Sequence, residues 1–277
     1  MGLHAAILNQ EPESVLFGNL PEQMSALTGW PVTTQDSNLD IAYLMGWAKR
    51  TPPRCRSFVP YQALLTALDK RSQARAFALA RVPVPETVLL HSEDELRHLL
   101  RAAPERRWAL KWPLGCGGLG HRLVTTATDF GPLTALWPRP LVVQEYIATS
   151  EPVVYRVHAA GGDLFSWTSR RYPSFMPALP WVSVALGAEQ RQIDCPSESA
   201  QAAAAAALRA TSLLDSFGCV DLLQASDGKW LVLEVNTDGI ASFVLRDPRL
   251  PDLSDEINLR LRDALTHWAA LNRRTSK

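Results

Sequence analysis

The sequence of 277 residues predicts an α/β protein with α+β subdomains, and three observations indicate this fold class. Short apolar runs at 4–10 and 39–47 are separated by turn residues and a helix-like stretch at 21–27, as in a small α/β lobe. Further along the chain, helical patterns alternate with runs typical of β-strands. Glycine-containing turns join two pairs of these strands, which predicts β-hairpins.

Composition and charge narrow the functional classes. Hydrophobic residues make up 47% of the chain, enough to bury a sizeable core in one large domain or two to three subdomains. Lysine plus arginine and aspartate plus glutamate each total 28, so no net field favours nucleic acid or an anionic membrane as a partner. No apolar run of about 18 residues and no signal-peptide pattern occurs, so we expect a cytoplasmic protein without a membrane partner.

The four cysteines do not indicate a structural role. Cys55, Cys116, Cys195 and Cys219 are widely scattered, and no two of them form a CxxC motif. Zinc sites and disulfide frameworks both need closer or more regular cysteine spacing. The sequence therefore predicts free thiols.

The first half of the chain continues with helices and strands. A proline-rich connector at 51–60 precedes a helical pattern over 61–81 that breaks near Asp69 and Lys70, and residues 82–90 should be extended. Ser92 and Glu95 form a capping box for a helix that should run to about residue 103. Three strands should follow, at 106–112, 121–126 and 140–147.

The second half should be built on two hairpins. The segments 152–160 and 163–171 flank a Gly-Gly turn. Residues 172–197 contain four prolines and no clear period, which predicts a long irregular connection of the kind that often serves a binding site. An alanine-rich helix should occupy 199–217 and end at Gly218, and a last amphipathic helix should run from about Ser254 to Asn272.

The second hairpin carries polar residues on a face that should otherwise be apolar. Segments 218–225 and 229–236 flank Asp227-Gly228, and a two-residue loop places Asp221 opposite Glu234, with Asn236 on the same face. Opposed residues on one face have Cβ atoms about 5 Å apart, and two carboxylates there repel unless something neutralises them. Together with a carboxamide they form a hard oxygen set that suits Mg²⁺ bound with phosphate. A solvated polar sheet face is the alternative, and a three-residue loop would shift the register.

A glycine-rich stretch between two predicted strands is the second candidate element. Such a loop can fold its backbone N–H groups around phosphate oxygens, and Lys111 on the preceding strand would add a positive charge. The order of residues is neither a P-loop nor a GxGxxG helix start. The remaining interpretation is a glycine-rich flap between antiparallel strands. Its four glycines are Gly115, Gly117, Gly118 and Gly120.

Five segments, in order, resemble the ATP-grasp superfamily. They are "LDKRSQARAFALARVPVPET" with Lys70, Lys111 before the flap, "VVQEYI", "VVYRVHAAGGDLFSWTSRR" and "CVDLLQASDGKWLVLEVN". The resemblance covers about residues 61 to 245 and is greatest to carboxylate–amine ligases similar to ribosomal-protein glutamate ligases and graspetide macrocyclases. It implies an ATP-grasp fold with a short N-terminal α/β lobe at 1–60, a central subdomain with the flap at 61–143, and a C-terminal subdomain with the metal site at 144–277.

The resemblance also implies ATP and Mg²⁺ as cofactors, and it assigns the site residues. The phosphates of ATP would contact Lys70 and Lys111 under the flap. The adenine hinge would be formed by Gln144, Glu145, Tyr146 and Ile147. The Mg²⁺ ligands would be Asp221, Glu234 and Asn236. Arg156 and Arg170, on the two arms of the first hairpin, would steady the γ-phosphate and an acyl phosphate.

The expected activity is an ATP-dependent ligation of a carboxylate to an amine or hydroxyl, on an amino acid, a peptide or a natural-product precursor. An ATP-grasp kinase and a non-catalytic nucleotide-binding protein are the alternatives. Val154 stands where related ligases carry an acidic residue, and the N-terminal lobe is short, so the substrate stays open between a small molecule and a peptide. A homodimer is possible. None of the six histidines is assigned a role; His121 follows the flap, where a contact with phosphate is the alternative to a structural or exposed histidine.

Overall fold

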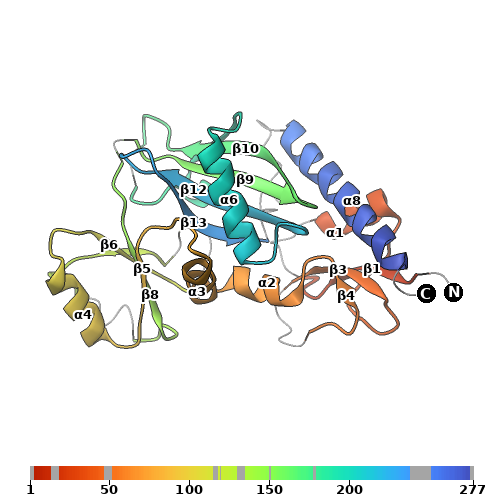
Figure 1. The fold of residues 1–277 in the computed structure, drawn as a ribbon, viewed down its shortest axis with the longest axis horizontal. Helices are drawn as coiled ribbons and strands as arrows, with labels where there is room; N and C mark the ends of the chain where they lie inside the picture. Colours follow the sequence, from red (N-terminus) through yellow and green to blue (C-terminus); the bar gives the residue numbers. More distant parts are fainter. Residues whose placement is uncertain are drawn as a thin grey trace.

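The computed structural model describes residues 3–13, 19–46, 52–114, 118, 120–129, 135–149, 151–176, 179–237 and 251–274. Three sheets follow one another along the molecule, with the N-terminal sheet at one end, the largest in the middle and the third at the other end (Figure 1). They occur in the order of the three predicted segments, whose exact boundaries stay a prediction. No helix in the described ranges is long and apolar enough to cross a membrane.

The N-terminal sheet is parallel and has the strand order β2-β1-β3-β4. The two central strands confirm the predicted apolar runs and are fully buried apart from Ala5. Helix α1 (Leu20–Thr28) packs against α8, the last helix of the chain. The four strands are β1 (Ala5–Asn9), β2 (Val32–Thr33), β3 (Ile41–Met45) and β4 (Arg56–Ser57).

The predicted break in the following helical pattern separates α2 (Tyr61–Leu68) from α3 (Lys70–Ala80). Asp69 caps α3, because its carboxylate accepts a hydrogen bond from the backbone N–H of Arg71 at 2.9 Å and pairs with the Arg71 guanidinium. Lys70 is thereby the first residue of α3. Its own N–H donates to the carbonyl of Pro113 at 2.9 Å, which ties the start of α3 to the base of the flap.

The antiparallel sheet of the predicted central subdomain lies at the end of the molecule and is called the central sheet below, after that subdomain (Figure 1). It has the order β5-β8-β6-β7 and a small core of its own. Helix α4 (Glu93–Ala102) covers it through Leu96 and Leu100. Ser92 caps α4 as predicted, because its hydroxyl accepts from the N–H of Glu95. The Glu95 carboxylate accepts from the N–H of His91, one residue before the N–H of Ser92 that a capping box would use. The strands are β5 (Thr87–Leu90), β6 (Trp108–Lys111), β7 (Arg122–Val124) and β8 (Leu141–Glu145).

The largest sheet is antiparallel and has the order β11-β10-β9-β12-β13. Helix α6 (Glu198–Ala210) lies across β12 and β13, and α8 (Pro251–Arg274) runs beside β9 and β10 (Figure 1). The main apolar core lies between this sheet and its helices. The strands are β9 (Val154–Ala160), β10 (Asp163–Arg171), β11 (Glu189–Gln192), β12 (Phe217–Gln224) and β13 (Trp230–Asn236).

Several predicted boundaries in this half are wrong. Helix α6 ends at Ala210, and Gly218 does not stop it but lies within β12. A Cβ at Gly218 would lie 3.1 Å from the Leu208 side chain, so glycine permits the close approach of helix and strand. The connection at 172–197 is not wholly irregular, since it contains β11 and a 3-10 turn, η1 (Val184–Leu186). Helix α8 begins at Pro251 rather than at Ser254.

The described cysteines Cys55, Cys195 and Cys219 form no disulfide with one another, as predicted, and Cys116 lies outside the described residues.

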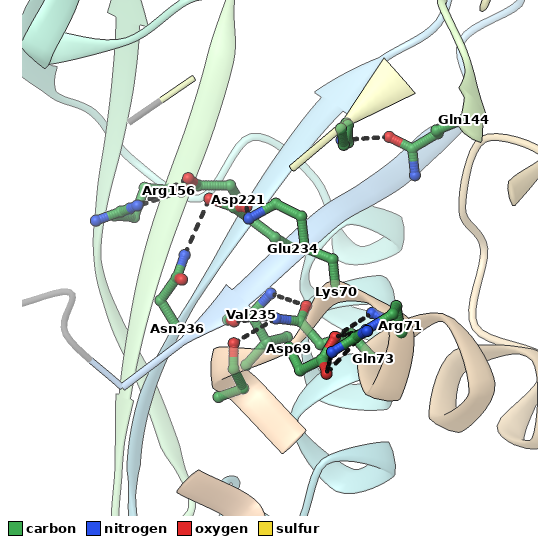
Figure 2. A network of polar contacts seen from close by, with 12 residues as sticks. Asp69, Lys70, Arg71, Gln73, Gln144, Arg156, Asp221, Glu234, Val235 and Asn236 are labelled. Carbon is green, nitrogen blue, oxygen red and sulfur yellow. Dashed lines mark hydrogen bonds and ion pairs between the residues drawn. The ribbon is translucent and has the colours of Figure 1, made fainter. Parts of the chain in front are cut away.

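Strand β13 is an edge strand, and its outer edge is covered by hydrogen bonds from other elements. Gln73 of α3, only 3% exposed, accepts from the N–H of Val235 at 2.9 Å and donates to the Val235 carbonyl at 2.9 Å (Figure 2). The same amide donates to the carbonyl of Ala67 at 2.6 Å. The N–H of Val232 donates to the carbonyl of Pro83 at 2.8 Å. These contacts hold an edge that would otherwise expose unpaired backbone groups.

Gln73→Ala should therefore lower the free energy of unfolding by about 3 kcal/mol, because it leaves the N–H and carbonyl of Val235 buried without partners. Urea unfolding followed by circular dichroism measures the change. Gln62→Ala, an exposed position on the neighbouring helix α2, is the control and should stay within about 0.5 kcal/mol of the wild type. Equal losses in both variants would contradict the role of Gln73.

Candidate active site

The hairpin of β12 and β13 does bring Asp221 opposite Glu234, but its turn is longer than predicted. The N–H of Ala225 donates to the carbonyl of Lys229 at 2.8 Å, so the loop contains three residues instead of two. Its last residue, Gly228, has φ +84°, which glycine adopts without strain. With this loop alone, Asp221 would face a different residue, and the two-residue prediction is wrong.

A β-bulge in β13 restores the predicted pairing. Leu222 pairs with Val232, whereas the preceding Asp221 pairs with Glu234, so Leu233 is the extra residue on the bulged strand. The one-residue shift at the loop and the one-residue shift at the bulge cancel. Beyond the bulge, normal alternation places Asn236 on the face of Glu234, as predicted.

Two arginines neutralise Asp221. Arg156 lies directly opposite Asp221 on β9, and its guanidinium donates to both carboxylate oxygens at 2.6 and 2.7 Å (Figure 2). Arg170 of β10 reaches the same carboxylate at 3.5 Å and donates to the Gln190 side chain at 3.0 Å. Burial, followed by the charge of Arg156, lowers the pKa of Arg170 to about 10. Both predicted arginines therefore meet at one carboxylate.

Glu234 has cationic partners of its own. Lys70, at the start of α3, lies 3.1 Å from one carboxylate oxygen, and the Asn236 amide donates to the other at 3.1 Å (Figure 2). Burial alone would raise the pKa of Glu234, but the charges of Lys70 and Lys111 outweigh burial and lower the pKa well below its usual range. Glu234 is thus ionised at neutral pH.

Lys111, the last residue of β6, approaches this cluster from the central sheet. Its ammonium donates to the Gln144 side chain at 2.5 Å, and the Gln144 amide donates to the Thr87 hydroxyl at 2.9 Å. Burial lowers the pKa of Lys111 to about 8, because the attraction of Glu234 offsets only part of the desolvation. Gln144, a predicted hinge residue, is therefore also the hydrogen-bond acceptor that holds this lysine.

The predicted hinge residues lie where β8 leaves the central sheet. The Glu145 carboxylate pairs with Arg106 at 3.0 Å and is held away from the cluster. The N–H of Tyr146 donates to the carbonyl of Arg107 at 2.8 Å, and the Arg107 guanidinium lies over the Tyr146 ring. Ile147 follows them, and all four hinge residues line the cavity described next.

A cavity of about 130 Å³ lies between the central and largest sheets, next to the charged cluster and the predicted hinge. Apolar side chains from both sheets form two of its walls, and Lys111, Asp221 and Glu234 lie in its lining. Gly118 also lines it, whereas the predicted flap residues Gly115 and Gly117 lie outside the described residues. The apolar walls are Pro85, Ala109, Leu223 and Leu233.

Two residues of the cavity wall had no predicted role of their own. His121, directly after the flap, lies in the lining, and so does Trp181 from the long connection. The rings of His121 and Trp181 meet edge to face with centroids 5.4 Å apart. Trp181 also packs on Gly118, where φ is +75° and a Cβ would lie 3.5 Å from the indole. For His121, the sequence signal was its position directly after the flap. For Trp181, the only signal was the proline-rich, aperiodic character of 172–197, which indicated a binding segment without indicating the residue.

The donor set at Asp221, Glu234 and Asn236 suits Mg²⁺. Two carboxylates and a carboxamide supply hard oxygen ligands at one point of the sheet. In the described part of the chain, no group of three or more His, Cys, Asp and Glu side chains could hold a metal ion by itself. The three residues would therefore bind Mg²⁺ together with oxygens of a ligand, as is usual for this ion beside phosphates.

The charges of the cluster favour an anionic ligand. Four cations, Lys70, Lys111, Arg156 and Arg170, surround two carboxylates, Asp221 and Glu234, which leaves a surplus of two positive charges. Cations with low solvent exposure attract a phosphate more strongly than they would in water. The apolar cavity beside the cluster can accept a flat ring. A nucleotide has both an anionic phosphate group for the cluster and a flat base for the cavity.

Comparisons with known proteins fit this geometry. No family model matches the chain, and no curated protein matches its sequence. Among solved structures, D-cycloserine synthetase DcsG is similar with a TM-score of 0.68 and 21% identity, over 96% of this chain and 99% of that chain. The D-alanine–D-alanine ligase from Bacillus anthracis has a TM-score of 0.68 and 15% identity, over 99% and 98%. The ATP-grasp ligase PsnB has a TM-score of 0.60 and 14% identity, over 92% and 99%.

The chain has the ATP-grasp fold. Its cavity lies between two antiparallel sheets, and of the four predicted flap glycines the structure describes Gly118 and Gly120. At this level of identity the similarity concerns the fold, so the chemistry has to be argued from the residues of the site.

Lys111→Met should stabilise the protein at pH 7 and less so at higher pH. The pKa of Lys111 is about 8 in the folded chain and 10.5 ordinarily, so the unfolded chain binds more protons between these values and wild-type stability rises with pH there. In urea unfolding, the difference in free energy of unfolding between Lys111→Met and the wild type should be smaller at pH 9.5 than at pH 7. Lys229→Met, at an exposed turn, should give a constant difference. A constant difference for Lys111→Met would contradict its desolvation.

Proposed function

We propose that this protein is an ATP- and Mg²⁺-dependent ligase that activates a carboxylate as an acyl phosphate and joins it to an amine or hydroxyl. The observation that carries the proposal is the pair of opposed carboxylates, Asp221 and Glu234, set among four cations on the wall of the cavity. The ATP-grasp fold supports it, because solved ligases have this architecture.

The assignment of residues to roles follows the order of side chains along β12 and β13. Leu223 and Leu233 line the apolar part of the cavity, and Asp221 and Glu234 come next along the same strands. Adenine would therefore lie between the leucines and the hinge at 144–147. The phosphates would lie beside Lys70 and Lys111, beneath the flap at 115–120.

The catalytic role assigned to the arginines is electrostatic. Arg156 and Arg170 are held by Asp221, so their guanidinium groups are fixed in place before a ligand binds. They would neutralise charge on the transferring phosphoryl group and on the acyl phosphate. Mg²⁺ bound by Asp221, Glu234 and Asn236 would supply further neutralisation of phosphate charge.

The reaction needs no side-chain nucleophile. A substrate carboxylate oxygen bonds to the γ-phosphorus of ATP while the bond to ADP breaks. An amine then attacks the acyl carbon, phosphate leaves with the bonding electrons, and the amine loses a proton. The residues of the chain orient the reactants and exclude water, which would otherwise hydrolyse the acyl phosphate.

The substrate class remains an amino acid, a peptide or a natural-product precursor. The ATP-grasp ligase PsnB was solved in complex with a minimal precursor, and DcsG is a synthetase of the small molecule D-cycloserine. A precursor substrate and a small-molecule product are therefore both compatible with this fold. A homodimer and a cytoplasmic location complete the proposal as expectations from the sequence.

Hydroxylamine trapping tests the activity. The protein is incubated with Mg-ATP and pooled amino acids, peptides and small carboxylates, and hydroxamate and ADP are measured. Substrate-dependent hydroxamate together with equal ADP is the expected result, because hydroxylamine attacks an acyl phosphate as the amine would. Phosphorylated alcohol without hydroxamate would indicate a kinase instead, and nucleotide binding without ADP release would indicate a non-catalytic protein.

Glu234→Gln should lower kcat at least about 100-fold while the circular dichroism spectrum stays unchanged, because it removes one charge from the metal-binding set and preserves its shape. Glu105→Gln, at an exposed loop position, is the matched control and should retain full turnover. Wild-type turnover in Glu234→Gln would remove the metal assignment.

A further inference from the structure

The two arginines of the first hairpin are held by different partners. Arg156 donates through Nε and one terminal nitrogen to the two carboxylate oxygens of Asp221, at 2.6 and 2.7 Å. Arg170 donates through Nε to the side-chain carbonyl of Gln190 at 3.0 Å, and its Nη1 lies 3.5 Å from Asp221. The hydrogen bond that orients Arg170 therefore comes from Gln190, whereas Asp221 orients Arg156.

Gln190 is placed beside Arg170 by the pairing of β10 and β11. The two residues are direct partners in the antiparallel register, so their side chains project from the same face of the sheet. Both are buried, with 7% and 8% of their surface exposed. A guanidinium can only donate hydrogen bonds, so the carbonyl oxygen of the carboxamide, and not its NH₂ group, faces Arg170. The strand pairing thus presents a fixed acceptor to this arginine.

The hydrogen bond at Nε leaves the far end of Arg170 available to a ligand. A guanidinium is planar, so fixing Nε–H on Gln190 turns the terminal nitrogens away from Gln190, with Nη1 toward Asp221. In the described part of the chain, Nη2 has no hydrogen-bond partner, and it is not among the polar atoms that are sealed from solvent. Nη2 lies at the same end of the side chain as Nη1, so an anion bound next to Asp221 can accept a hydrogen bond from it.

A purely structural role for Gln190 would be to hold β11 onto β10. The backbone already does this, because the two strands pair over four residues and the N–H of Ile193 donates to the carbonyl of Trp167 at 2.9 Å just beyond them. Gln192, two positions later on β11, is exposed, whereas Gln190 is buried against Arg170. Burying a carboxamide costs free energy unless it is hydrogen-bonded, so the burial of Gln190 points to its arginine partner.

We propose that Gln190 is the positioning residue for Arg170, and that Arg170 contacts the γ-phosphoryl group of the bound nucleotide, the group that the proposed ligase transfers. The proposal rests on the proposed function only in requiring that the site binds a nucleotide. Arg156 is less suitable for this contact, because two of its nitrogens already donate to Asp221. Lys111 lines the cavity and Arg170 does not, so Arg170 suits the phosphate farthest from the base.

Two nucleotides separate this contact from the rest of the site. Mg-ADP lacks the γ-phosphoryl group, whereas Mg-AMP-PNP, a non-hydrolysable ATP analogue, carries it, so the ratio of their affinities reports contacts with that group. Gln190→Met removes the acceptor and keeps the length of the side chain. We expect it to weaken AMP-PNP binding about tenfold and to leave ADP binding within about threefold of the wild type. Gln192→Met, exposed on the same strand, is the matched control and should leave both affinities within about threefold.

Calorimetric titration measures these affinities, and thermal unfolding confirms that each variant is folded. Gln190→Asn withdraws the acceptor by one methylene, should weaken AMP-PNP binding in the same direction, and decides the matter where Gln190→Met does not fold. Wild-type affinity for AMP-PNP in the folded variants would overturn the proposal. Equal weakening of ADP and AMP-PNP would also overturn it, because it would assign a structural role to Gln190.

A double-mutant cycle tests whether Gln190 acts through Arg170. Arg170→Met alone should weaken AMP-PNP binding by at least about tenfold, with a smaller effect on ADP. Adding Gln190→Met to this variant should cause no further loss, because the group that Gln190 orients is gone. Losses that add up in the double variant would contradict a positioning role.

Binding and turnover distinguish this proposal from the proposed ligase activity. A wild-type protein that binds both nucleotides but forms no hydroxamate would contradict the ligase, while the Gln190 and Arg170 variants would still decide the contact. A wild-type protein that binds no nucleotide would overturn both.

Discussion

Two carboxylates facing each other across a pair of strands are the constraint on which the site depends. Asp221 and Glu234 would repel if left alone, and a sheet face cannot hold them unless cations lie close by. Those cations come from the same sheet, from the neighbouring sheet and from α3. Arg156 and Arg170 lie on the first hairpin of the same sheet, Lys111 lies on β6 of the neighbouring sheet, and Lys70 begins α3. Neutralising one pair of residues therefore fixes how the elements around the cavity are arranged.

The structural supports of the fold and of the site are largely the same residues. Asp69 caps α3, and this cap begins the helix at Lys70, within reach of Glu234. Gln73, one turn later, covers the edge of β13 at Val235, between the two proposed metal ligands on that strand. A change in the cap or in the edge contact would therefore move Lys70 and the proposed metal ligands together, since these residues form one network (Figure 2). Stability and function cannot be separated in this region.

Local patterns predicted much of the fold and the polar residues of the site, whereas compensating irregularities and distant contacts were out of reach. Alternation along β13 predicted that Glu234 and Asn236 share a face, and the turn residues predicted a hairpin. The three-residue loop and the bulge at Leu233 were missed, and Asp221 was placed correctly only because their shifts cancel. Strand β11 and the contact between Trp181 and His121 were missed because each depends on a partner far away in the sequence.

The lowered pKa values of Lys111 and Arg170 give a physical reason for the proposed magnesium nucleotide. Both cations are removed from water more fully than their partners compensate, so the ligand-free site carries a surplus of two positive charges at an energetic cost. A nucleoside triphosphate with one Mg²⁺ carries about two negative charges and balances that surplus. An uncharged ligand would leave the cost in place, and free phosphate would leave the apolar walls uncovered. Charge balance and cavity shape thus select the same class of ligand for different physical reasons.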